Sequence, residues 1–141
     1  MTAPVFLDTN VLVYLFANED PQRQQVAEHL YVQTAADGST VISTQVLQEL
    51  YSVATRTMRS AISPSTARLA LEKLMEHRVV QMTPRMILQA ARRSASDQLS
   101  IWDALIVEAA LAGGCRTLYS EDFQHGRAFG PLRVVDPFRA G

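Results

Sequence analysis

Short apolar runs alternate with longer amphipathic segments along the chain. Because each run is brief and bounded by turn or capping residues, it is typical of a short strand rather than a helix. The runs are 4–7, 40–43, 79–82, 116–119 and 133–135. Strands separated by helices imply right-handed crossovers and a mainly parallel sheet that is covered on both faces. The pattern therefore predicts an α/β protein with helices on either side of a central sheet.

Capping residues mark the helices between these runs. Asp20 followed by Pro21 is typical of a helix start, and we expect this helix to end at about Ala36, before Asp37-Gly38. The other predicted N-caps are Thr44, Ser63 (before Pro64), Thr83 (before Pro84) and Ser100, and the last helix should end at about Ala112, before Gly113-Gly114. After 4–7, Asp-Thr-Asn indicates a turn or a helix start.

Apolar side chains at helical spacing predict which face of each helix is buried. The predicted inward positions are Val46, Leu47, Leu50, Tyr51 and Ala54, then Ala67, Leu71, Leu74 and Met75, and then Met86, Ile87, Ala90 and Ala91. These stripes are long enough to cover a sheet, so we expect one compact core.

Length and composition favour a single globular domain over residues 1–141. The apolar fraction of 48% argues against intrinsic disorder. Cys115 is the only cysteine, which excludes an internal disulfide and a multi-cysteine zinc site and fits a reducing, cytoplasmic location. The sequence has no apolar run of about 18 residues, the length of a membrane-spanning helix. An early Asp8 argues against a signal peptide, so we expect no membrane association.

The net charge of −1 removes the simplest argument for nucleic-acid binding, which is a strongly basic footprint. The basic residues are unevenly spread, however, and all but Lys73 are arginines. The planar guanidinium group of arginine can donate two parallel hydrogen bonds to a phosphate. Arg56, Arg85 and Arg92 are candidate RNA-binding residues in two stretches without acidic residues; the first stretch also holds Arg59. The alternatives are a solvated helix face and pairing with acids of a partner protein.

Four acidic residues occupy positions near the predicted carboxyl ends of strands. They are Asp8, Glu49, Asp103 and Asp122. Ligands in parallel sheets bind outside these strand ends, so we expect the four side chains to cluster. Carboxylate oxygens suit Mg²⁺ and Mn²⁺, and such ions can activate a water for attack on phosphorus.

Each acidic residue also has an ordinary structural explanation. Asp8 could simply begin the Asp-Thr-Asn turn, and Glu49 could be one half of a buried pair. Asp103 fits the Ser-x-x-Asp capping box that starts at Ser100. Asp122 and its neighbour Glu121 could be turn residues.

Four segments together resemble the acidic motifs of PIN-domain ribonucleases, and most closely those of the VapC-like toxins of toxin–antitoxin pairs. The segments are LDTNVLVYLF (7–16), STQVLQELYSV (43–53), SIWDALIVEAALAGG (100–114) and LYSEDFQHG (118–126). The resemblance runs from residue 5 to about residue 138. It implies a three-layer α/β/α sandwich and Mg²⁺- or Mn²⁺-dependent hydrolysis of RNA, with an antitoxin protein as partner and a homodimer as assembly.

Residue by residue, the resemblance places Asp8, Glu49, Asp103 and Asp122 at the four metal-binding and catalytic positions. Asn10 and Ser120 fall on polar positions that support the site. Glu121 is the weaker candidate beside Asp122, and we assign His125 no role beyond that of a turn residue.

Three other interpretations stay open at this point. The chain could be a PIN-domain RNA-processing nuclease that is not a toxin, or a non-catalytic domain that binds RNA or protein. A phosphoacceptor domain is the weakest, because it expects paired acids after the first strand and a lysine after the last, whereas Lys73 lies mid-chain. The sequence does not identify the RNA.

Overall fold

The computed structural model of the protein describes residues 2–58 and 61–139. Its strands are β1 (Val5–Leu7), β2 (Thr40–Ser43), β3 (Arg78–Val80), β4 (Thr117–Tyr119), β5 (Ala128–Phe129) and β6 (Leu132–Val135). Its helices are α1 (Thr9–Val13), α2 (Pro21–Asp37), α3 (Thr44–Ser52), α4 (Pro64–Leu74), α5 (Pro84–Asp97) and α6 (Ile101–Ala112), and a π-helical turn, η1 (Val53–Thr57), continues α3.

The strands form one sheet in the order β3-β2-β1-β4-β6-β5, in which only β5 runs antiparallel to its neighbour. The chain moves outward from β1 through β2 to β3 and then returns to place β4 on the other side of β1. Leu7 and Tyr119 are therefore paired neighbours although they are far apart in sequence. This reversal creates a topological switch point at the carboxyl ends of β1 and β4, the place where open α/β sheets bind ligands.

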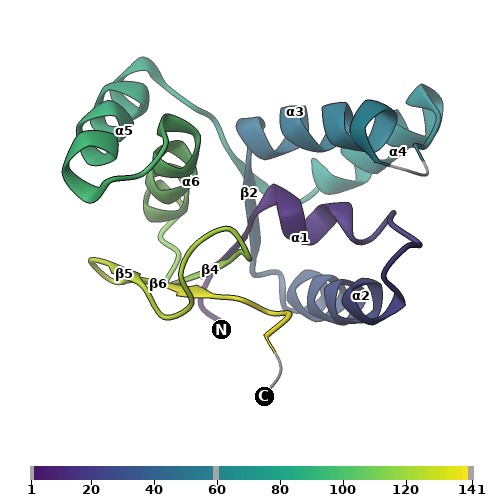
Figure 1. Cartoon of the computed structure of the whole chain (residues 1–141). Coiled ribbons are helices and arrows are strands. Elements are labelled where there is room, and N and C mark those ends of the chain that lie inside the picture. Colours follow the sequence, from purple (N-terminus) through teal and green to yellow (C-terminus); the bar gives the residue numbers. More distant parts are fainter. Residues whose placement is uncertain (1, 59–60, 140–141) are drawn as a thin grey trace.

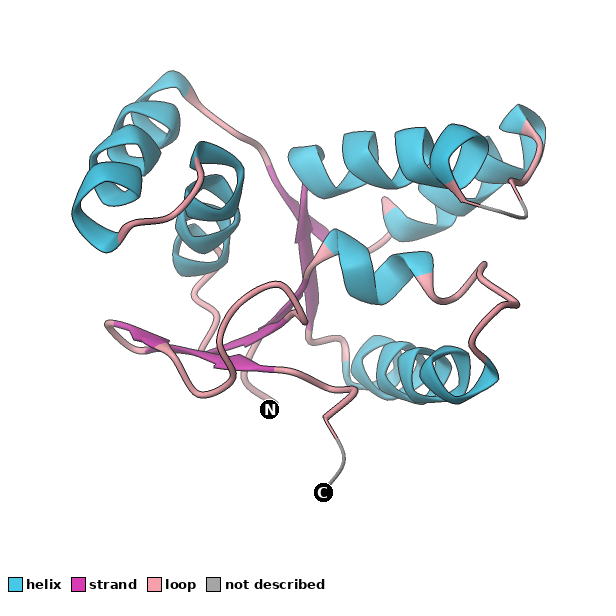
Figure 2. Ribbon diagram, in the orientation of Figure 1, coloured by secondary structure: helices cyan, strands magenta, loops and turns pink. Residues whose placement is uncertain are grey.

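Helices cover both faces of the sheet, as Figure 1 shows. Helices α1 to α4 lie on one side, and α5 and α6 lie together on the other (Figures 1 and 2). Phe6, Ile42 and Leu118 of the central strands are fully buried, and Val46 of α3 and Val107 of α6 pack in the same core. The predicted three-layer α/β/α sandwich with a mainly parallel sheet is confirmed.

Most predicted boundaries agree with the structure to within one or two residues, because capping signals are local. Asp20, Ser63, Thr83 and Ser100 each accept a hydrogen bond from a backbone N–H in the first turn of the helix that follows. Gly38 ends α2 in the left-handed conformation, with φ 68°.

The prediction that Thr44 caps α3 is wrong. Ser43, the last residue of β2, is the N-cap, and its hydroxyl accepts from Val46 N at 3.3 Å. The Thr44 hydroxyl instead accepts from Met82 N at 3.3 Å, where the chain leaves β3. β3 ends at Val80, whose partner Ser43 is the last residue of β2, so the strand does not extend to residue 82 as predicted.

Four predicted inward positions are also wrong. Tyr51 of α3 is 37% exposed. Met75 is 61% exposed because α4 ends at Leu74 and Met75 lies at its C-cap. Ile87 is 49% exposed and Ala91 is exposed as well, since α5 buries only Ala90 fully. The sequence pattern also missed β5, which has two residues and pairs with β6 across a tight turn.

Within residues 2–58 and 61–139, no helix is both long enough and apolar enough to cross a bilayer.

Candidate active site

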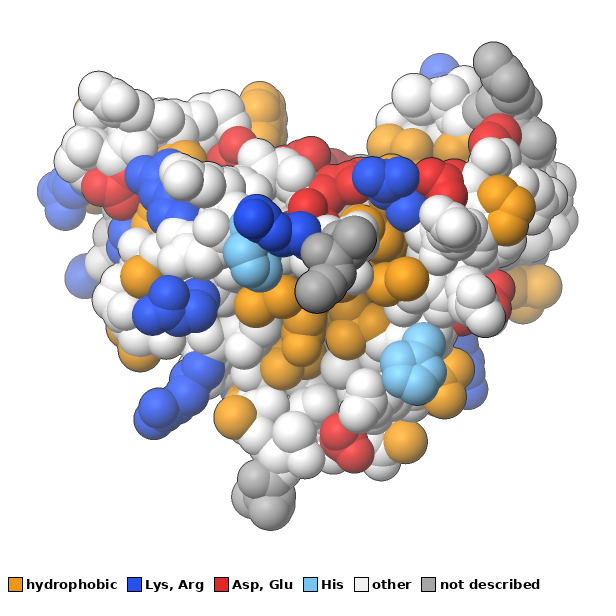
Figure 3. All heavy atoms as spheres, turned by 60° about the horizontal axis from the view of Figure 1, so that its bottom comes forward, with side chains coloured by type: hydrophobic (Ala, Val, Ile, Leu, Met, Phe, Trp, Pro, Cys, Tyr) orange, Lys and Arg blue, Asp and Glu red, His pale blue; other side chains and the backbone are white. Residues whose placement is uncertain are grey.

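A pocket of about 370 Å³ opens at the switch point. Its lining comes from α1, α3, α6 and the turn after β4, elements that are distant in sequence. The lining residues are Asp8, Thr9, Asn10, Val13, Tyr14, Gln45, Glu49, Val53, Trp102, Asp103, Ile106, Glu121 and Asp122. All four acidic residues singled out in the sequence therefore share one cavity. In Figure 3, acidic side chains (red) gather along the notch between the two lobes of the molecule.

Asp8 lies at the bottom of this arrangement, only 4% exposed, as the N-cap of α1. Its Oδ1 accepts from Thr9 N at 2.7 Å, and its Oδ2 accepts from the Ser120 hydroxyl at 2.8 Å and Asn10 Nδ2 at 3.3 Å. Burial raises the pKa of Asp8 to about 7, although the hydrogen bonds from Ser120 and Thr9 oppose that rise. The negative charges of Asp122 and Glu49 raise this pKa further.

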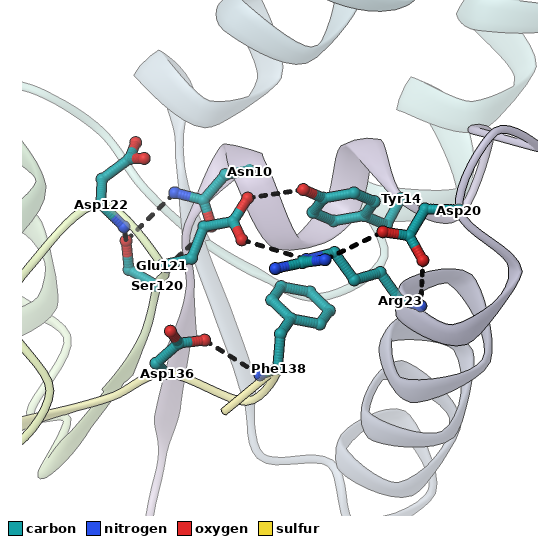
Figure 4. A network of polar contacts seen from close by, with 9 residues as sticks. All are labelled: Asn10, Tyr14, Asp20, Arg23, Ser120, Glu121, Asp122, Asp136 and Phe138. Carbon is teal, nitrogen blue, oxygen red and sulfur yellow. Dashed lines mark hydrogen bonds and ion pairs between the residues drawn. The ribbon is translucent and has the colours of Figure 1, made fainter. Parts of the chain in front are cut away.

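Ser120 and Asn10 connect the turn after β4 to α1 (Figure 4). The Ser120 hydroxyl accepts from Asn10 Nδ2 and from Asp122 N, both at 3.1 Å. Asn10 Oδ1 accepts from Glu121 N at 3.2 Å. These bonds fix the backbone that carries Asp122, and they fix Asp8 in the same network.

Glu49 reaches the pocket from α3. Its Oε1 accepts from the Thr9 hydroxyl at 3.0 Å and from Gln45 Nε2 at 3.4 Å. Thr9 follows Asp8 in the chain, so a hydrogen bond joins the segments that carry these two carboxylates.

Asp103 enters the pocket from the first turn of α6. Its backbone N–H donates to the Ser100 hydroxyl at 3.0 Å, so the residue has the predicted place in the cap as well as a place in the pocket. Burial, and then the charge of Asp122, raise the pKa of Asp103, while the Ser100 hydroxyl lowers it. Because Asp122 also raises the pKa of Asp8, its charge acts on both neighbours.

Glu121 belongs to a different group of contacts at the edge of the pocket (Figure 4). Its carboxylate accepts from the Tyr14 hydroxyl at 2.7 Å and lies 3.5 Å from Arg23 Nε. Burial and the bond to Glu121 raise the pKa of Tyr14 to about 12, so the phenol stays protonated and donates. Arg23 also pairs with Asp20 and lies over the rings of Tyr14 and Phe138. Both oxygens of the Glu121 carboxylate therefore have partners at the edge of the pocket.

The oxygen donors of the pocket fit a hard divalent cation such as Mg²⁺ or Mn²⁺. Asp8, Glu49, Asp103 and Asp122 supply carboxylates. Burial first, and then the negative charge of neighbouring carboxylates, raise the pKa of Asp8 and of Asp103. Within residues 2–58 and 61–139, however, no three Asp, Glu, His or Cys side chains are close enough to hold one ion between them. The donor chemistry fits the ion, whereas a three-residue ligand set is not assembled.

The candidate RNA-binding arginines lie outside this pocket. Arg56 is exposed in η1, three residues after Val53, which lines the cavity. Arg85 and Arg92 line a separate hollow on α5 with Pro84, Leu88 and Gln89. Arg59 lies outside the described residues.

His125 is part of the loop that follows β4. Its Nδ1 accepts from Asp136 N at 3.1 Å, which ties the loop to the end of β6. This contact gives the residue a structural role.

The sequence interpretation missed several residues that line the pocket. Thr9, Gln45 and Trp102 are each adjacent to a predicted acidic residue, either in sequence or one helical turn away. That spacing was the available signal. In a sequence, a neutral or aromatic residue is not by itself a sign of a metal or phosphate site. The sequence pattern therefore did not single out these three residues.

Fold and pocket define a class: an α/β/α sandwich with a carboxylate-lined cavity at the switch point of a mainly parallel sheet. The family model of the PIN domain matches residues 5–128. The chain therefore belongs to the PIN domain family. A comparison with curated protein sequences found no match.

Several solved structures have the same fold. VapC20 of Mycobacterium tuberculosis, described as a sarcin-ricin loop cleaving toxin, is 22% identical, with a TM-score of 0.68 over 85% of this chain and 91% of its own. DNA-bound VapBC from Salmonella typhimurium is 18% identical, with a TM-score of 0.66 over 96% of this chain and 99% of its own. A toxin–antitoxin complex from Klebsiella pneumoniae is 19% identical, with a TM-score of 0.66 over 96% and 98%. At these identities the likeness establishes the fold.

Proposed function

We propose that this protein is a metal-dependent endoribonuclease that uses Mg²⁺ or Mn²⁺ to hydrolyse RNA phosphodiester bonds, as a single cytoplasmic nuclease domain over residues 1–141. The observation that carries the proposal is the convergence of four carboxylates from four elements in one pocket. Membership of the PIN domain family supports it.

The reaction is hydrolysis at phosphorus. A water oxygen forms a bond to phosphorus while the bond to the 3′ oxygen breaks, which leaves a 3′-hydroxyl and a 5′-phosphate. A bound divalent cation would lower the pKa of the attacking water and screen the charge that develops on the phosphate and the leaving oxygen.

The residues of the chain have distinct roles in this proposal. Asp8, Glu49, Asp103 and Asp122 would hold the cation. Ser120 and Asn10 orient the Asp8 carboxylate and the turn that carries Asp122 through the hydrogen bonds described above. Such supporting contacts fix ligand geometry and contribute to metal affinity. Arg56, Arg85 and Arg92 remain the proposed contacts to RNA phosphates outside the pocket.

A cleavage assay on a mixed RNA pool tests the nuclease. We expect cleavage with Mg²⁺ or Mn²⁺, none in EDTA, and products with 5′-phosphate ends. Asp8→Asn and Asp103→Asn should each slow cleavage by more than about 100-fold, because even residues that only support metal ligands contribute about 10- to 100-fold. Asp37→Asn, at the exposed end of α2, is the matched control and should cut normally. Equal cleavage by wild type and Asp8→Asn would refute the metal assignment.

We further propose that the nuclease is the toxin of a toxin–antitoxin pair and forms a homodimer. The support is the fold shared with the VapBC structures from Salmonella typhimurium and Rickettsia felis and with the Klebsiella pneumoniae complex. Co-expression with a small protein encoded in the adjoining reading frame should give a stable complex that no longer cuts RNA. Light scattering gives the mass of each assembly. If the co-expressed protein neither binds nor inhibits, the antitoxin proposal fails while the nuclease proposal stands.

One observation favours a second candidate, a PIN domain that binds RNA or protein without cutting. No three potential ligands are gathered for one ion in the part of the chain that the structure describes. RNA binding without metal-dependent cleavage of any RNA pool would establish this candidate and exclude the first.

A further inference from the structure

Trp102 is an exposed aromatic side chain at an acidic pocket. It is the only tryptophan in the chain, it precedes Asp103, and it lines the cavity while 62% of its surface is exposed. An exposed aromatic ring beside a groove offers a face on which a nucleic-acid base can stack. A role in metal binding cannot account for this residue, because an indole offers no oxygen donor.

Gln45 supplies a second, independent feature on the same side of the pocket. The residue is 7% exposed, and its Oε1 is a buried atom that has no hydrogen-bond partner among residues 2–58 and 61–139. The amide orientation is set by Nε2, which donates to Glu49 Oε1 at 3.4 Å and to the Trp102 carbonyl oxygen at 3.3 Å. An acceptor held in this way beside a cavity is ready for a donor on a ligand.

The pocket has an apolar part in addition to its acidic part. Val13, Val53 and Ile106 line it together with the carboxylates and Trp102. A phosphate alone gains nothing from such a surface, whereas a nucleotide base has apolar faces and polar edges. The combination of an exposed indole, apolar lining and a buried acceptor matches a base.

We infer that Trp102 and Gln45 form a subsite for one unpaired nucleotide beside the cleaved phosphodiester. The base stacks on the Trp102 indole, and a donor group of that nucleotide bonds to Gln45 Oε1. This inference rests on the proposed ribonuclease function and specifies its substrate as a single-stranded or looped segment. A paired base inside a duplex has no free face to stack on an indole, so duplex RNA is excluded from the subsite.

The lone tryptophan provides a direct measurement of contact. RNA oligonucleotides of mixed sequence are added to Asp8→Asn protein in Mg²⁺, a background chosen so that cleavage does not interfere. We expect single-stranded RNA to quench the Trp102 fluorescence in a saturable manner, and a blunt duplex of the same sequence to leave it unchanged at equal concentration.

Variants in the same background separate stacking from general affinity. We expect Trp102→Ala to weaken binding of a labelled single strand by about 5- to 100-fold, and Trp102→Phe, which keeps an aromatic face, to weaken it much less. Gln45→Leu should also weaken binding. Leu69→Ala is the matched control, since Leu69 is a large apolar residue of α4 with 63% exposure and lies outside the pocket. Circular dichroism verifies that each variant folds.

In the active enzyme, loss of Trp102 should raise KM far more than it lowers kcat, as expected when binding is lost equally from ground and transition states. Unchanged fluorescence and unchanged affinity in Trp102→Ala, in an enzyme that still cuts RNA, overturn the inference and leave the proposed function intact. The same holds if Trp102→Ala weakens only the binding of a protein partner. Absence of RNA cleavage in the wild type instead refutes the proposed function itself.

Discussion

The Ser120 hydroxyl donates a 2.8 Å hydrogen bond to Asp8 Oδ2 and so joins two residues that lie 112 positions apart in the chain. Ser120 follows β4 and Asp8 follows β1, and these strands are neighbours in the sheet. The bond therefore closes the base of the pocket at the switch point.

Ser120→Ala removes a fully buried hydroxyl that also accepts from Asn10 Nδ2 and Asp122 N. We expect a loss of about 1–3 kcal/mol in the free energy of unfolding, because buried partners are left unsatisfied. Urea denaturation measures it. Ser52→Ala, at an exposed position of α3, is the control and should change stability by less than about 0.5 kcal/mol. Equal effects of the two variants would contradict the role of the Ser120 network.

Asp8→Asn should stabilise the metal-free protein at neutral pH. The pKa of Asp8 is raised from 3.8 to about 7 by burial, so between these values the folded state keeps a proton that the unfolded state has lost. Wild-type stability therefore falls as pH rises through this window, by about 4 kcal/mol at most. An asparagine carries no charge and escapes this loss.

Urea denaturation in EDTA from pH 4 to pH 8.5 tests this expectation. The advantage of Asp8→Asn should grow between pH 4 and pH 7 and then level off. Parallel stability curves for the two proteins across this range would show that Asp8 is not perturbed.

Mg²⁺ should stabilise the wild-type protein at pH 8. A cation that binds only the folded state adds about 2.7 kcal/mol at a concentration 100 times its Kd. The rise in Tm should shrink at pH 5.5, where Asp8 retains its proton, and in Asp8→Asn at both pH values. Sodium chloride at the same ionic strength is the control. A sodium effect as large as that of Mg²⁺ would indicate general screening.

Arg93 connects α5 to α6 away from the pocket. Its Nε lies 2.9 Å from Glu108 Oε1, a second guanidinium nitrogen lies 3.1 Å from Asp97 Oδ2, and the group stacks over Phe129. With the side chain about a quarter exposed, we expect Arg93→Ala to cost about 1–2 kcal/mol. Arg92→Ala, at the neighbouring exposed position, should change stability by less than about 0.5 kcal/mol. Thermal denaturation of both variants measures these changes in stability. Equal losses of stability in Arg93→Ala and Arg92→Ala would argue against the Arg93 bridge.

Local signals account for most of the fold that could be predicted. A side-chain cap followed by proline, as at Ser63 and Thr83, acts within one helical turn, so it is visible in sequence. The choice between Ser43 and Thr44 as a cap depends on where β2 leaves the sheet, which is a tertiary property. The two residues of β5 likewise form a strand only because they pair with β6, and this pairing is not visible in the local sequence.

The part of the candidate site that could be predicted from the sequence is its set of carboxylates near the ends of strands. Asp8 and Asp122 follow adjacent parallel strands, so topology brings them together. Gln45 and Trp102 could not be selected in this way, because their importance comes from the cavity between α3 and α6.

The place of β4 between β1 and β6 has a consequence for synthesis of the protein. Residues 120–122 follow the first 119 residues off the ribosome, and without them the pocket lacks the hydroxyl that holds Asp8 as well as the Asp122 carboxylate. The pocket is thus completed only when residues 120–122 have joined the sheet beside β1. A fragment that stops before β4 leaves Asp8 without its Ser120 partner.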